Sequence, residues 1–246
     1  EYDSVVVATG TTNANITPIE GLSKDHYSTG LEFMKEYNSG NIKDLKGDVI
    51  IIGGGFIGLE TAENLKHKNI NVTIIEKADQ VMAPLDPEMA SFIHGEIRRR
   101  NIALYLSSDI TEISNSGKKK IIKLKSGEEV EADIIIASIG VVPDSELAKN
   151  AGLKMTSKGA VEVDEYLKTS DSDIYAVGDV IEVTNAVTGQ KTLVPLAGPA
   201  NKQGRTAADN ILGREEKYTG TVGTSIMKFF NMTAASTGVN EKYLKK

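Results

Sequence analysis

Short runs of β-branched and other apolar residues alternate along the chain with longer stretches in which apolar side chains recur at helical spacing. The short runs predict core strands, which lie at residues 4–8, 49–52, 72–75, 102–106, 133–137 and 174–177. The helical spacing predicts helices at residues 31–37, 56–68, 87–100, 147–151 and about 200–212. Strands that alternate with helices favour an α/β fold with a parallel sheet.

Other segments depart from this alternation. Apolar positions separated by polar ones, with turn residues between the segments, predict an antiparallel meander at residues 110–114, 121–125 and 129–132. Short strands are expected at 160–163 and 225–229, and a polar connection at 11–25. The helix at 87–100 should begin at Asp86-Pro87-Glu88, with Asp86 as the N-cap and Pro87 in the first turn.

The most informative stretch joins two of the predicted strands through a glycine-rich turn and a helix. Gly53, Gly55 and Gly58 have the spacing G-x-G-x-x-G, which in dinucleotide-binding proteins provides a tight turn, a close approach of backbone to a pyrophosphate, and close helix–strand packing. The helix N-terminus supplies free N–H groups to the phosphates. Glu76 ends the second strand, about twenty positions after Gly55. A carboxylate there accepts hydrogen bonds from ribose hydroxyls and repels a 2′-phosphate, which predicts a site for NAD(H) in preference to NADP(H).

Composition narrows the possible function classes. The 246 residues carry a formal net charge of −6, which argues against nucleic acid or an anionic membrane as the main partner. The apolar runs are too short for a membrane span and the N-terminus has no signal-peptide pattern, so we expect a cytoplasmic protein. The chain has no cysteine, which excludes disulfides and thiol chemistry by this chain. Its three histidines do not have metal-ligand spacing.

Several motifs occur in an order that resembles one family of flavoproteins. They are Ala8-Thr9-Gly10, the glycine loop continuing into Leu59-Glu60, Ile139-Gly140, and Ala176-Val177-Gly178-Asp179. This order resembles the pyridine nucleotide–disulfide oxidoreductases, which have two dinucleotide-binding domains. Further segments resemble the branch of NADH oxidases, NADH peroxidases and coenzyme A disulfide reductases, namely Gln80-Val81-Met82-Ala83-Pro84-Leu85-Asp86, Pro195-Leu196-Ala197 ahead of Gln203-Gly204-Arg205, and Gly223-Thr224-Ser225. The resemblance covers essentially the whole chain.

The resemblance implies a Rossmann-like NAD(H)-binding domain inserted in an FAD-binding domain. Residues 1–30 and 141–221 would belong to the FAD-binding domain, residues 31–140 to the NAD(H)-binding domain, and residues 222–246 to the start of a C-terminal dimerisation domain. The family's N-terminal FAD glycine motif and its redox-active cysteine are absent from these 246 residues. We therefore expect the chain to be a piece of a longer enzyme that forms a homodimer.

Carried over residue by residue, the resemblance implies three sets of FAD contacts. Asp179, preceded by Gly178, would accept a hydrogen bond from a ribityl hydroxyl, or would only cap a helix or turn. Pro195-Leu196-Ala197 would offer N–H groups and a helix dipole to the flavin pyrimidine edge, or would form an ordinary helix start. Thr9-Gly10 would lie beside FAD, or would only end a strand.

For NAD(H), the implied contacts centre on the glycine loop and the helix that follows it. Phe56 and Glu60 are the catalytic candidates. Phe56 would be an aromatic gate over the flavin, displaced by the entering nicotinamide, or a core aromatic. Glu60 would contact the nicotinamide end, or belong to a solvated helix face. Gly140 would let backbone approach the NAD ribose, or form a turn, and Ile57 and Lys77 complete the expected contacts.

The sequence leaves three functions open. In the first, an enzyme transfers hydride from NADH to FAD and passes electrons to a disulfide such as coenzyme A disulfide, to peroxide or to oxygen. In the second, the chain by itself is an NAD(H)-binding module without turnover. In the third, it is a cysteine-free, NADH-dependent rubredoxin or ferredoxin reductase. Hydride transfer requires that nicotinamide be oriented against flavin and water excluded, which agrees with a sequence that shows no catalytic triad or obvious general base.

Overall fold

The computed structural model describes residues 2–11, 13–14, 27–42 and 46–245, which form two compact units. Unit 1 comprises Glu1–Asn13, Val141–Ile226 and Ala235–Val239, and unit 2 comprises Ala14–Gly140, Met227–Ala234 and Asn240–Lys246. The two-residue strands β2 (Asn13–Ala14) and β11 (Val141–Val142) lie where the chain passes from one unit to the other. The polar connection predicted at residues 11–25 falls almost wholly outside the described residues.

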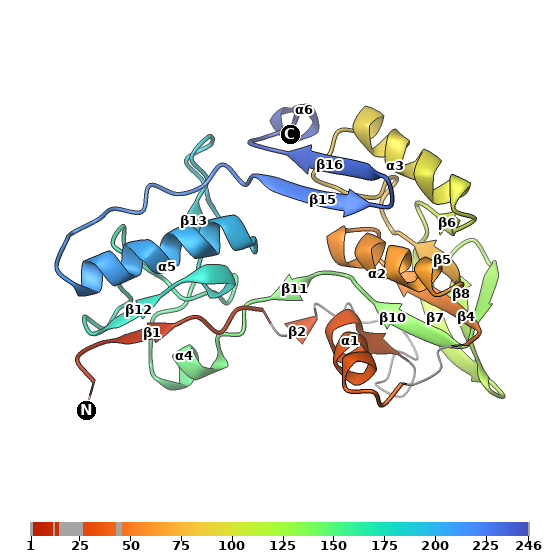
Figure 1. Cartoon of the computed structure of the whole chain (residues 1–246), viewed down its shortest axis with the longest axis horizontal. Helices are drawn as coiled ribbons and strands as arrows, with labels where there is room; N and C mark the ends of the chain where they lie inside the picture. Colours follow the sequence, from red (N-terminus) through yellow and green to blue (C-terminus); the bar gives the residue numbers. More distant parts are fainter. Residues whose placement is uncertain (1, 12, 15–26, 43–45, 246) are drawn as a thin grey trace. The chain divides into compact units, whose positions relative to one another are not determined.

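Unit 2 is built on a five-stranded parallel sheet (Figure 1). Its strands lie in the order β3 (Ser28–Thr29), β10 (Ile134–Ala137), β4 (Asp48–Ile52), β5 (Asn71–Ile75) and β6 (Ala103–Tyr105). The crossovers between successive strands contain the helices α1 (Gly30–Asn38), α2 (Phe56–His67) and α3 (Pro87–Arg99). The predicted core strands and helices of this part of the sequence are therefore confirmed, with boundaries that shift by one or two residues.

Strand β4 shows why these strands are apolar at consecutive positions. Val49 and Ile51 belong to a core shared with the three helices. Ile50 and Ile52 point the other way and belong to a second core. That second core is closed by the predicted antiparallel meander, which consists of β7 (Ile110–Ser116), β8 (Lys119–Leu124) and β9 (Glu129–Ala132). Alternate side chains of a strand face opposite sides, so a strand buried on both sides must be apolar throughout.

The C-terminal part of the chain contributes to the helical side of unit 2. β15 (Ser225–Phe229) and β16 (Met232–Ser236) form a hairpin, and α6 (Glu241–Leu244) follows. Met227, Phe229 and Phe230 are buried in the core that contains α2 and α3. The Phe230 ring lies against His67 of α2 and under the Arg100 guanidinium, 4.3 Å from its centre.

Asp86 is in its predicted N-cap position, but its carboxylate has a different partner. It occupies the N-cap position of α3, with extended backbone geometry, and Pro87 follows in the first turn as predicted. Its carboxylate does not cap the helix, however. It accepts hydrogen bonds from the backbone N–H groups of Glu241 and Lys242, at 3.2 and 3.1 Å. The carboxylate therefore fixes the start of α6 against the start of α3 within unit 2, a role that depends on residues more than 150 positions away in the sequence.

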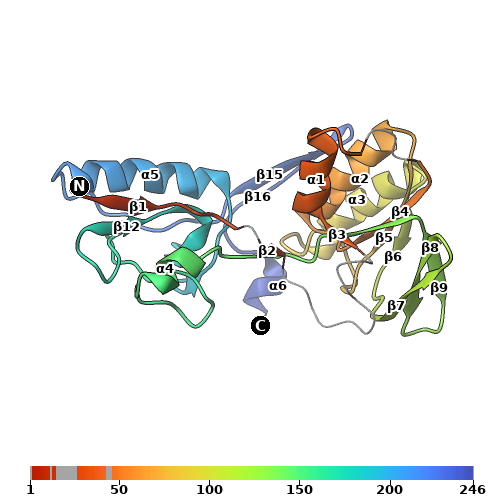
Figure 2. The same cartoon turned by 90° about the horizontal axis from the view of Figure 1, so that it is seen from below.

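Unit 1 has a smaller core. The parallel pair β1 (Val5–Val7) and β12 (Ile174–Ala176) leads into the 3₁₀ turn η1 (Gly178–Val180), which packs against α5 (Ala197–Ile211). Figure 2 shows α5 lying along β1 and β12. The core is completed by side chains from α4 (Glu146–Asn150) and the hairpin of β13 (Val183–Thr184) and β14 (Lys191–Thr192).

Three predictions for unit 1 need correction. Val5 and Val6 are 49% and 45% exposed, because β1 has a described strand neighbour, β12, on one side only. Residues 160–163 do not form a strand, since Val161 makes only single-residue bridges to Met155 and Ile181. Helix α5 begins at Ala197, earlier than expected, and the proline in its first turn is tolerated because N–H groups there need no intrahelical partner.

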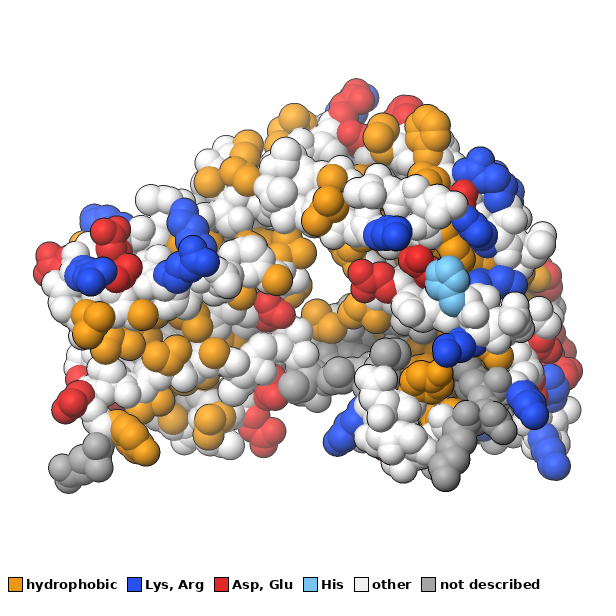
Figure 3. All heavy atoms as spheres, in the orientation of Figure 1, with side chains coloured by type: hydrophobic (Ala, Val, Ile, Leu, Met, Phe, Trp, Pro, Cys, Tyr) orange, Lys and Arg blue, Asp and Glu red, His pale blue; other side chains and the backbone are white. Residues whose placement is uncertain are grey.

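Helix α3 has one buried charged residue on an otherwise apolar inner face. Ile93 and Ile97 are buried in the core, whereas Met89 and Phe92 are exposed, and hydrophobic side chains are visible over this helix in Figure 3. Glu96 is only 6% exposed and accepts hydrogen bonds from Arg100 and Arg99, at 2.8 and 2.9 Å. Like every helix among the described residues, α3 is too short or too polar to cross a lipid bilayer.

Replacing the buried carboxylate should make stability less dependent on pH. The hydrogen bond from Arg100, supported by that from Arg99, lowers the pKa of Glu96 against the opposing effect of burial. A group whose pKa is lower in the folded state stabilises the fold above its unfolded pKa and loses this effect as pH falls through the folded pKa. We expect Glu96→Gln to lower the free energy of unfolding by about 1–3 kcal/mol at neutral pH, and less in acid.

Urea unfolding followed by circular dichroism, at neutral pH and in acid, measures this difference. Glu131→Gln, which removes an exposed carboxylate on β9, is the matched control and should change little at either pH. An equal loss of stability at both pH values in Glu96→Gln would contradict the assignment.

Candidate functional site

The glycine loop between β4 and α2 is packed too tightly for side chains at two of its positions. Gly53 has φ +104°, and a Cβ there would lie 2.5 Å from the Ser138 carbonyl oxygen at the end of β10. A Cβ on Gly58 would lie 2.0 Å from the Gly53 carbonyl oxygen. Because Gly53 and Gly58 have no side chains, α2 can begin close to the end of β4. The tight turn and the close helix–strand packing predicted from the spacing are therefore both present.

The two intervening glycines differ from each other. A Cβ on Gly54 would lie 2.6 Å from Cγ1 of Val81, in the segment that follows β5. Gly55 is the N-cap of α2, has no side-chain cap, and has open space where a Cβ would be. The first turn of a helix has N–H groups without intrahelical partners and a partial positive charge. Gly55 therefore leaves an anion-binding helix end accessible.

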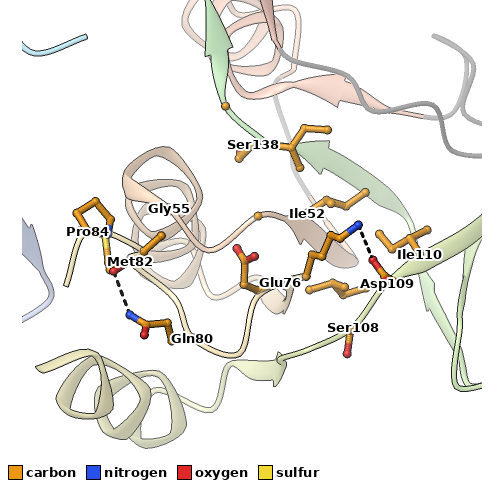
Figure 4. Close-up of a pocket in the computed structure, with 16 residues that line it drawn as sticks. Ile52, Gly55, Glu76, Gln80, Met82, Pro84, Ser108, Asp109, Ile110 and Ser138 are labelled. Carbon is orange, nitrogen blue, oxygen red and sulfur yellow. Dashed lines mark hydrogen bonds and ion pairs between the residues drawn. The ribbon is translucent and has the colours of Figure 1, made fainter. Parts of the chain in front are cut away.

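A cavity of about 490 Å³ lies at the carboxyl ends of β4, β5 and β10 in unit 2 (Figure 4). Ligands of open α/β sheets bind at this edge. The cavity is lined by the glycine loop, the segment after β5, the turn before β7 and the residues that follow β10. The lining residues are Ile52, Gly53, Gly55, Ile75, Glu76, Lys77, Gln80, Met82, Ala83, Pro84, Ser108, Asp109, Ile110, Ser138, Ile139 and Gly140.

Glu76 points into this cavity from the end of β5, toward the glycine loop (Figure 4). One carboxylate oxygen accepts the Gly54 N–H at 2.6 Å, and the other accepts the Ala78 N–H at 2.8 Å. An ionised carboxylate offers about four acceptor positions. The two backbone contacts thus fix the carboxylate and leave acceptor capacity for hydroxyl groups of a ligand.

Lys77 and Asp109 form an ion pair on the rim of the same cavity. Lys77 Nζ lies 3.0 Å from Asp109 Oδ1 (Figure 4). The Lys77 side chain is 79% exposed and that of Asp109 is 42% exposed. Such a pair contributes little to stability, but it sets the local charge beside Glu76.

The other predicted NAD(H) residues are placed differently. Gly140 lines the cavity with φ +106°. Phe56 is partly buried against the helical core, Ile57 is 41% exposed, and Glu60 is exposed on α2. Among the described residues, these three on α2 do not line the cavity.

In unit 1, Asp179 lies at the start of η1 beside the chain that leaves β1. Its carboxylate accepts a hydrogen bond of 3.4 Å from the Thr11 hydroxyl. Burial raises the pKa of Asp179, and the hydrogen bond from Thr11 opposes this only in part. Gly178, with φ +81°, donates its N–H to the side-chain oxygen of Gln203 at 2.7 Å. These contacts place the Gly178-Asp179 turn between β1 and α5.

Two further sets of predicted residues frame this turn. The Thr9 hydroxyl donates to the Asp144 carbonyl, and Gly10, with φ +72°, has open space where a Cβ would be. Leu196 is the N-cap of α5 and Ala197 its first residue, with no side-chain cap. Pro195-Leu196-Ala197 is therefore the start of the helix rather than a loop that precedes it. The Leu196 N–H donates to the Val194 carbonyl at 2.8 Å, so Ala197 and Gly198 supply the N–H groups of the first turn.

Several residues that shape these sites were not predicted from the sequence. Val81 packs against Gly54, where there would be no room for a side chain. In unit 1, Gln203 is 1% exposed, and its amide bonds to the Gly178 N–H and to the Tyr218 hydroxyl. The only sequence signal for Gly54 is its place in the middle of three consecutive glycines. Asp109 has no local signal at all.

Comparison with known proteins agrees with this geometry. The family described as pyridine nucleotide-disulphide oxidoreductase matches residues 1–204. An NAD(P)H sulfur oxidoreductase (CoA-dependent) from Pyrococcus furiosus is 34% identical over 249 residues, which cover 98% of this chain and 54% of that protein. The chain spans about half the length of the curated relatives it matches.

Solved structures support the same assignment. Reduced Bacillus anthracis CoADR-RHD has a TM-score of 0.89 and 40% identity, with 99% of this chain and 44% of that chain covered. The water-forming NADH oxidase from Lactobacillus brevis, bound to NADH, has a TM-score of 0.87 and 28% identity, with 99% and 54% covered. The fold class is confirmed as the Rossmann-like type of flavoproteins with two dinucleotide-binding domains. Because the family match covers most of its length, the chain belongs to the pyridine nucleotide-disulphide oxidoreductase family.

Proposed function

We propose that unit 2 binds NAD(H) in the cavity at the carboxyl ends of β4, β5 and β10. The observation that carries this proposal is the pairing of Gly55 with Glu76. Gly55 leaves the uncapped start of α2 accessible for a pyrophosphate. Glu76 is held by two backbone N–H groups with acceptor capacity remaining for the adenosine ribose. Gly140, which also lines the cavity, allows close approach of a ribose.

In the same proposal, unit 1 carries part of an FAD site. The partly buried Asp179 carboxylate accepts a long hydrogen bond from Thr11 and would accept a further one from a ribityl hydroxyl. Thr9-Gly10 would lie beside FAD. The uncapped start of α5 at Pro195-Leu196-Ala197 would stabilise negative charge on the reduced flavin.

The activity we propose for the whole enzyme is transfer of hydride from NADH to FAD, followed by reduction of a disulfide, peroxide or oxygen. NADH supplies the hydride and FAD accepts it when both are bound. The side chains of this chain bind and orient the two cofactors, with Phe56 and Glu60 proposed at the nicotinamide end. Relatives named for coenzyme A-dependent sulfur reduction and for water-forming NADH oxidation support acceptors of these classes. This chain has no cysteine and supplies no thiol to the second step.

Isothermal titration of the purified chain with NADH and NADPH tests the proposed site. We expect NADH to bind at least about tenfold more tightly, because the Glu76 carboxylate repels a 2′-phosphate. Glu76→Gln, which retains one oxygen acceptor but no charge, should reduce this preference several-fold. Glu129→Gln, which removes an exposed charge from β9, is the control and should keep it. Failure of the wild-type chain to bind NADH would refute the site.

The rim ion pair should also influence the choice of coenzyme. Asp109 draws Lys77 Nζ to itself at 3.0 Å, so Lys77 is not available as a partner for a 2′-phosphate. Asp109→Asn should tighten NADPH binding by about three- to tenfold and change NADH binding by less than about twofold, since NADH has no phosphate at this position. The dissociation constants come from the same titrations.

The double variant Lys77→Gln, Asp109→Asn is the control for this prediction. It removes the cation that would bind the 2′-phosphate, so it should lose the gain seen in Asp109→Asn. If the single and double variants bind NADPH equally well, Lys77 has no part in coenzyme selection.

A further inference from the structure

One wall of the proposed NAD(H) cavity is a short segment that has no regular secondary structure. Residues 80–85, which we call the wall segment, line the cavity through Gln80, Met82, Ala83 and Pro84. Met82 has φ +52°, a conformation that non-glycine residues rarely adopt. A segment with such backbone geometry keeps its shape only where surrounding contacts determine it.

The wall segment is packed directly against the glycine loop. Val81 is fully buried, and its Cγ1 would lie 2.6 Å from a Cβ on Gly54. The Met82 N–H donates to the Gly54 carbonyl at 2.9 Å. Gly54 in turn donates its own N–H to Glu76 at 2.6 Å. The position of Val81 and Met82 is thus coupled, through Gly54, to the carboxylate proposed to bind the ribose.

A histidine anchors the wall segment from the opposite side. His94 lies on α3, and its Nε2 accepts the Val81 N–H at 3.2 Å. An accepting ring nitrogen carries no proton, so His94 is neutral in this arrangement, with its proton on Nδ1. Protonation at Nε2 would set an N–H against an N–H and leave the buried Val81 amide without an acceptor.

The surroundings of His94 favour the neutral form. Burial, with a smaller contribution from the Arg98 guanidinium one turn further along α3, lowers the pKa of His94 from its ordinary value of 6.5. Asp79 and Asp86 flank the wall segment in the sequence, Glu76 is linked to it through Gly54, and Lys242 bonds to Asp86 through its backbone N–H. Lys242 donates to the Ala83 carbonyl at 2.9 Å and contacts the end of the segment away from Val81.

We propose that His94 is a positioning residue for the nucleotide site, whose neutral imidazole holds the wall segment against the glycine loop and makes NAD(H) affinity depend on pH. The proposal rests on the proposed NAD(H) site. Protonation of His94 releases Val81, the contact to Gly54 loosens, and affinity falls. The sign follows from linkage, because the nucleotide-binding arrangement requires the unprotonated ring. NAD(H) affinity has its highest value above the pKa of His94 and declines as pH falls through that pKa.

Titration of the purified chain with NAD⁺, which is stable in acid, tests this from about pH 8 to about pH 5. We expect the wild-type dissociation constant to rise by about three- to tenfold on acidification. In His94→Gln the side-chain oxygen takes the place of Nε2 as acceptor and does not titrate, so affinity should stay near the wild-type value at pH 8 over the whole pH range. His94→Leu should bind weakly at every pH. His67→Gln, which replaces the exposed histidine of α2, should retain the wild-type pH profile.

Amide hydrogen exchange at Val81 provides a readout that needs no nucleotide. We expect this amide to exchange about five- to tenfold faster in His94→Leu than in the wild-type chain, with β5 amides unchanged and His94→Gln close to wild type. The inference is overturned if Val81 exchange is the same in all three proteins, or if His94→Gln shows the wild-type pH profile of binding. Normal Val81 protection without any NAD⁺ binding would instead refute the NAD(H) site and leave the anchor in place.

Discussion

The close approach of backbone at the end of β4 is the constraint on which the rest of unit 2 depends. Side chains at Gly53, Gly54 and Gly58 would lie within 2.0–2.6 Å of backbone or buried side-chain atoms, distances that no packing adjustment of a few tenths of an ångström relieves. Their absence lets α2 start where the strand stops. As a result, the uncapped N-terminus of the helix, the end of β10 and the Glu76 carboxylate all meet at one cavity.

Burial of the sheet on both faces gives this edge its rigidity. The helical core and the meander core hold alternate residues of the same strand, so a strand cannot shift without disturbing both. The polar groups at the strand ends are held by hydrogen bonds between a side chain and the backbone. Glu76 is bound by two backbone N–H groups, and Gln203 in unit 1 holds Gly178 with a fully buried amide. In both units a buried or partly buried polar side chain orders the turn that follows a core strand.

Much of this arrangement follows from the sequence because it is local. The runs of β-branched residues, the G-x-G-x-x-G spacing and the acid after the second strand lie within one strand–helix–strand segment, and they predict β4, α2, β5 and the side of the cavity formed by Glu76. The errors also have local causes. Residues 160–163 have a strand-like composition but meet their neighbours at single residues. Helix α5 begins at Ala197, before the predicted start at about residue 200, because a helix tolerates a proline in its first turn.

The sequence by itself determined which segments become strands and helices and where a phosphate-binding turn lies, because periodicity and glycine spacing act over neighbouring residues. Only the tertiary structure decided which distant side chains meet at those segments. Val81 against Gly54, His94 on the Val81 amide, Lys77 with Asp109, and Asp86 on the start of α6 are contacts between residues 13 to 156 positions apart. No periodicity relates such pairs. They are set by how helices, sheet and meander pack, and they determine the shape and charge of the site.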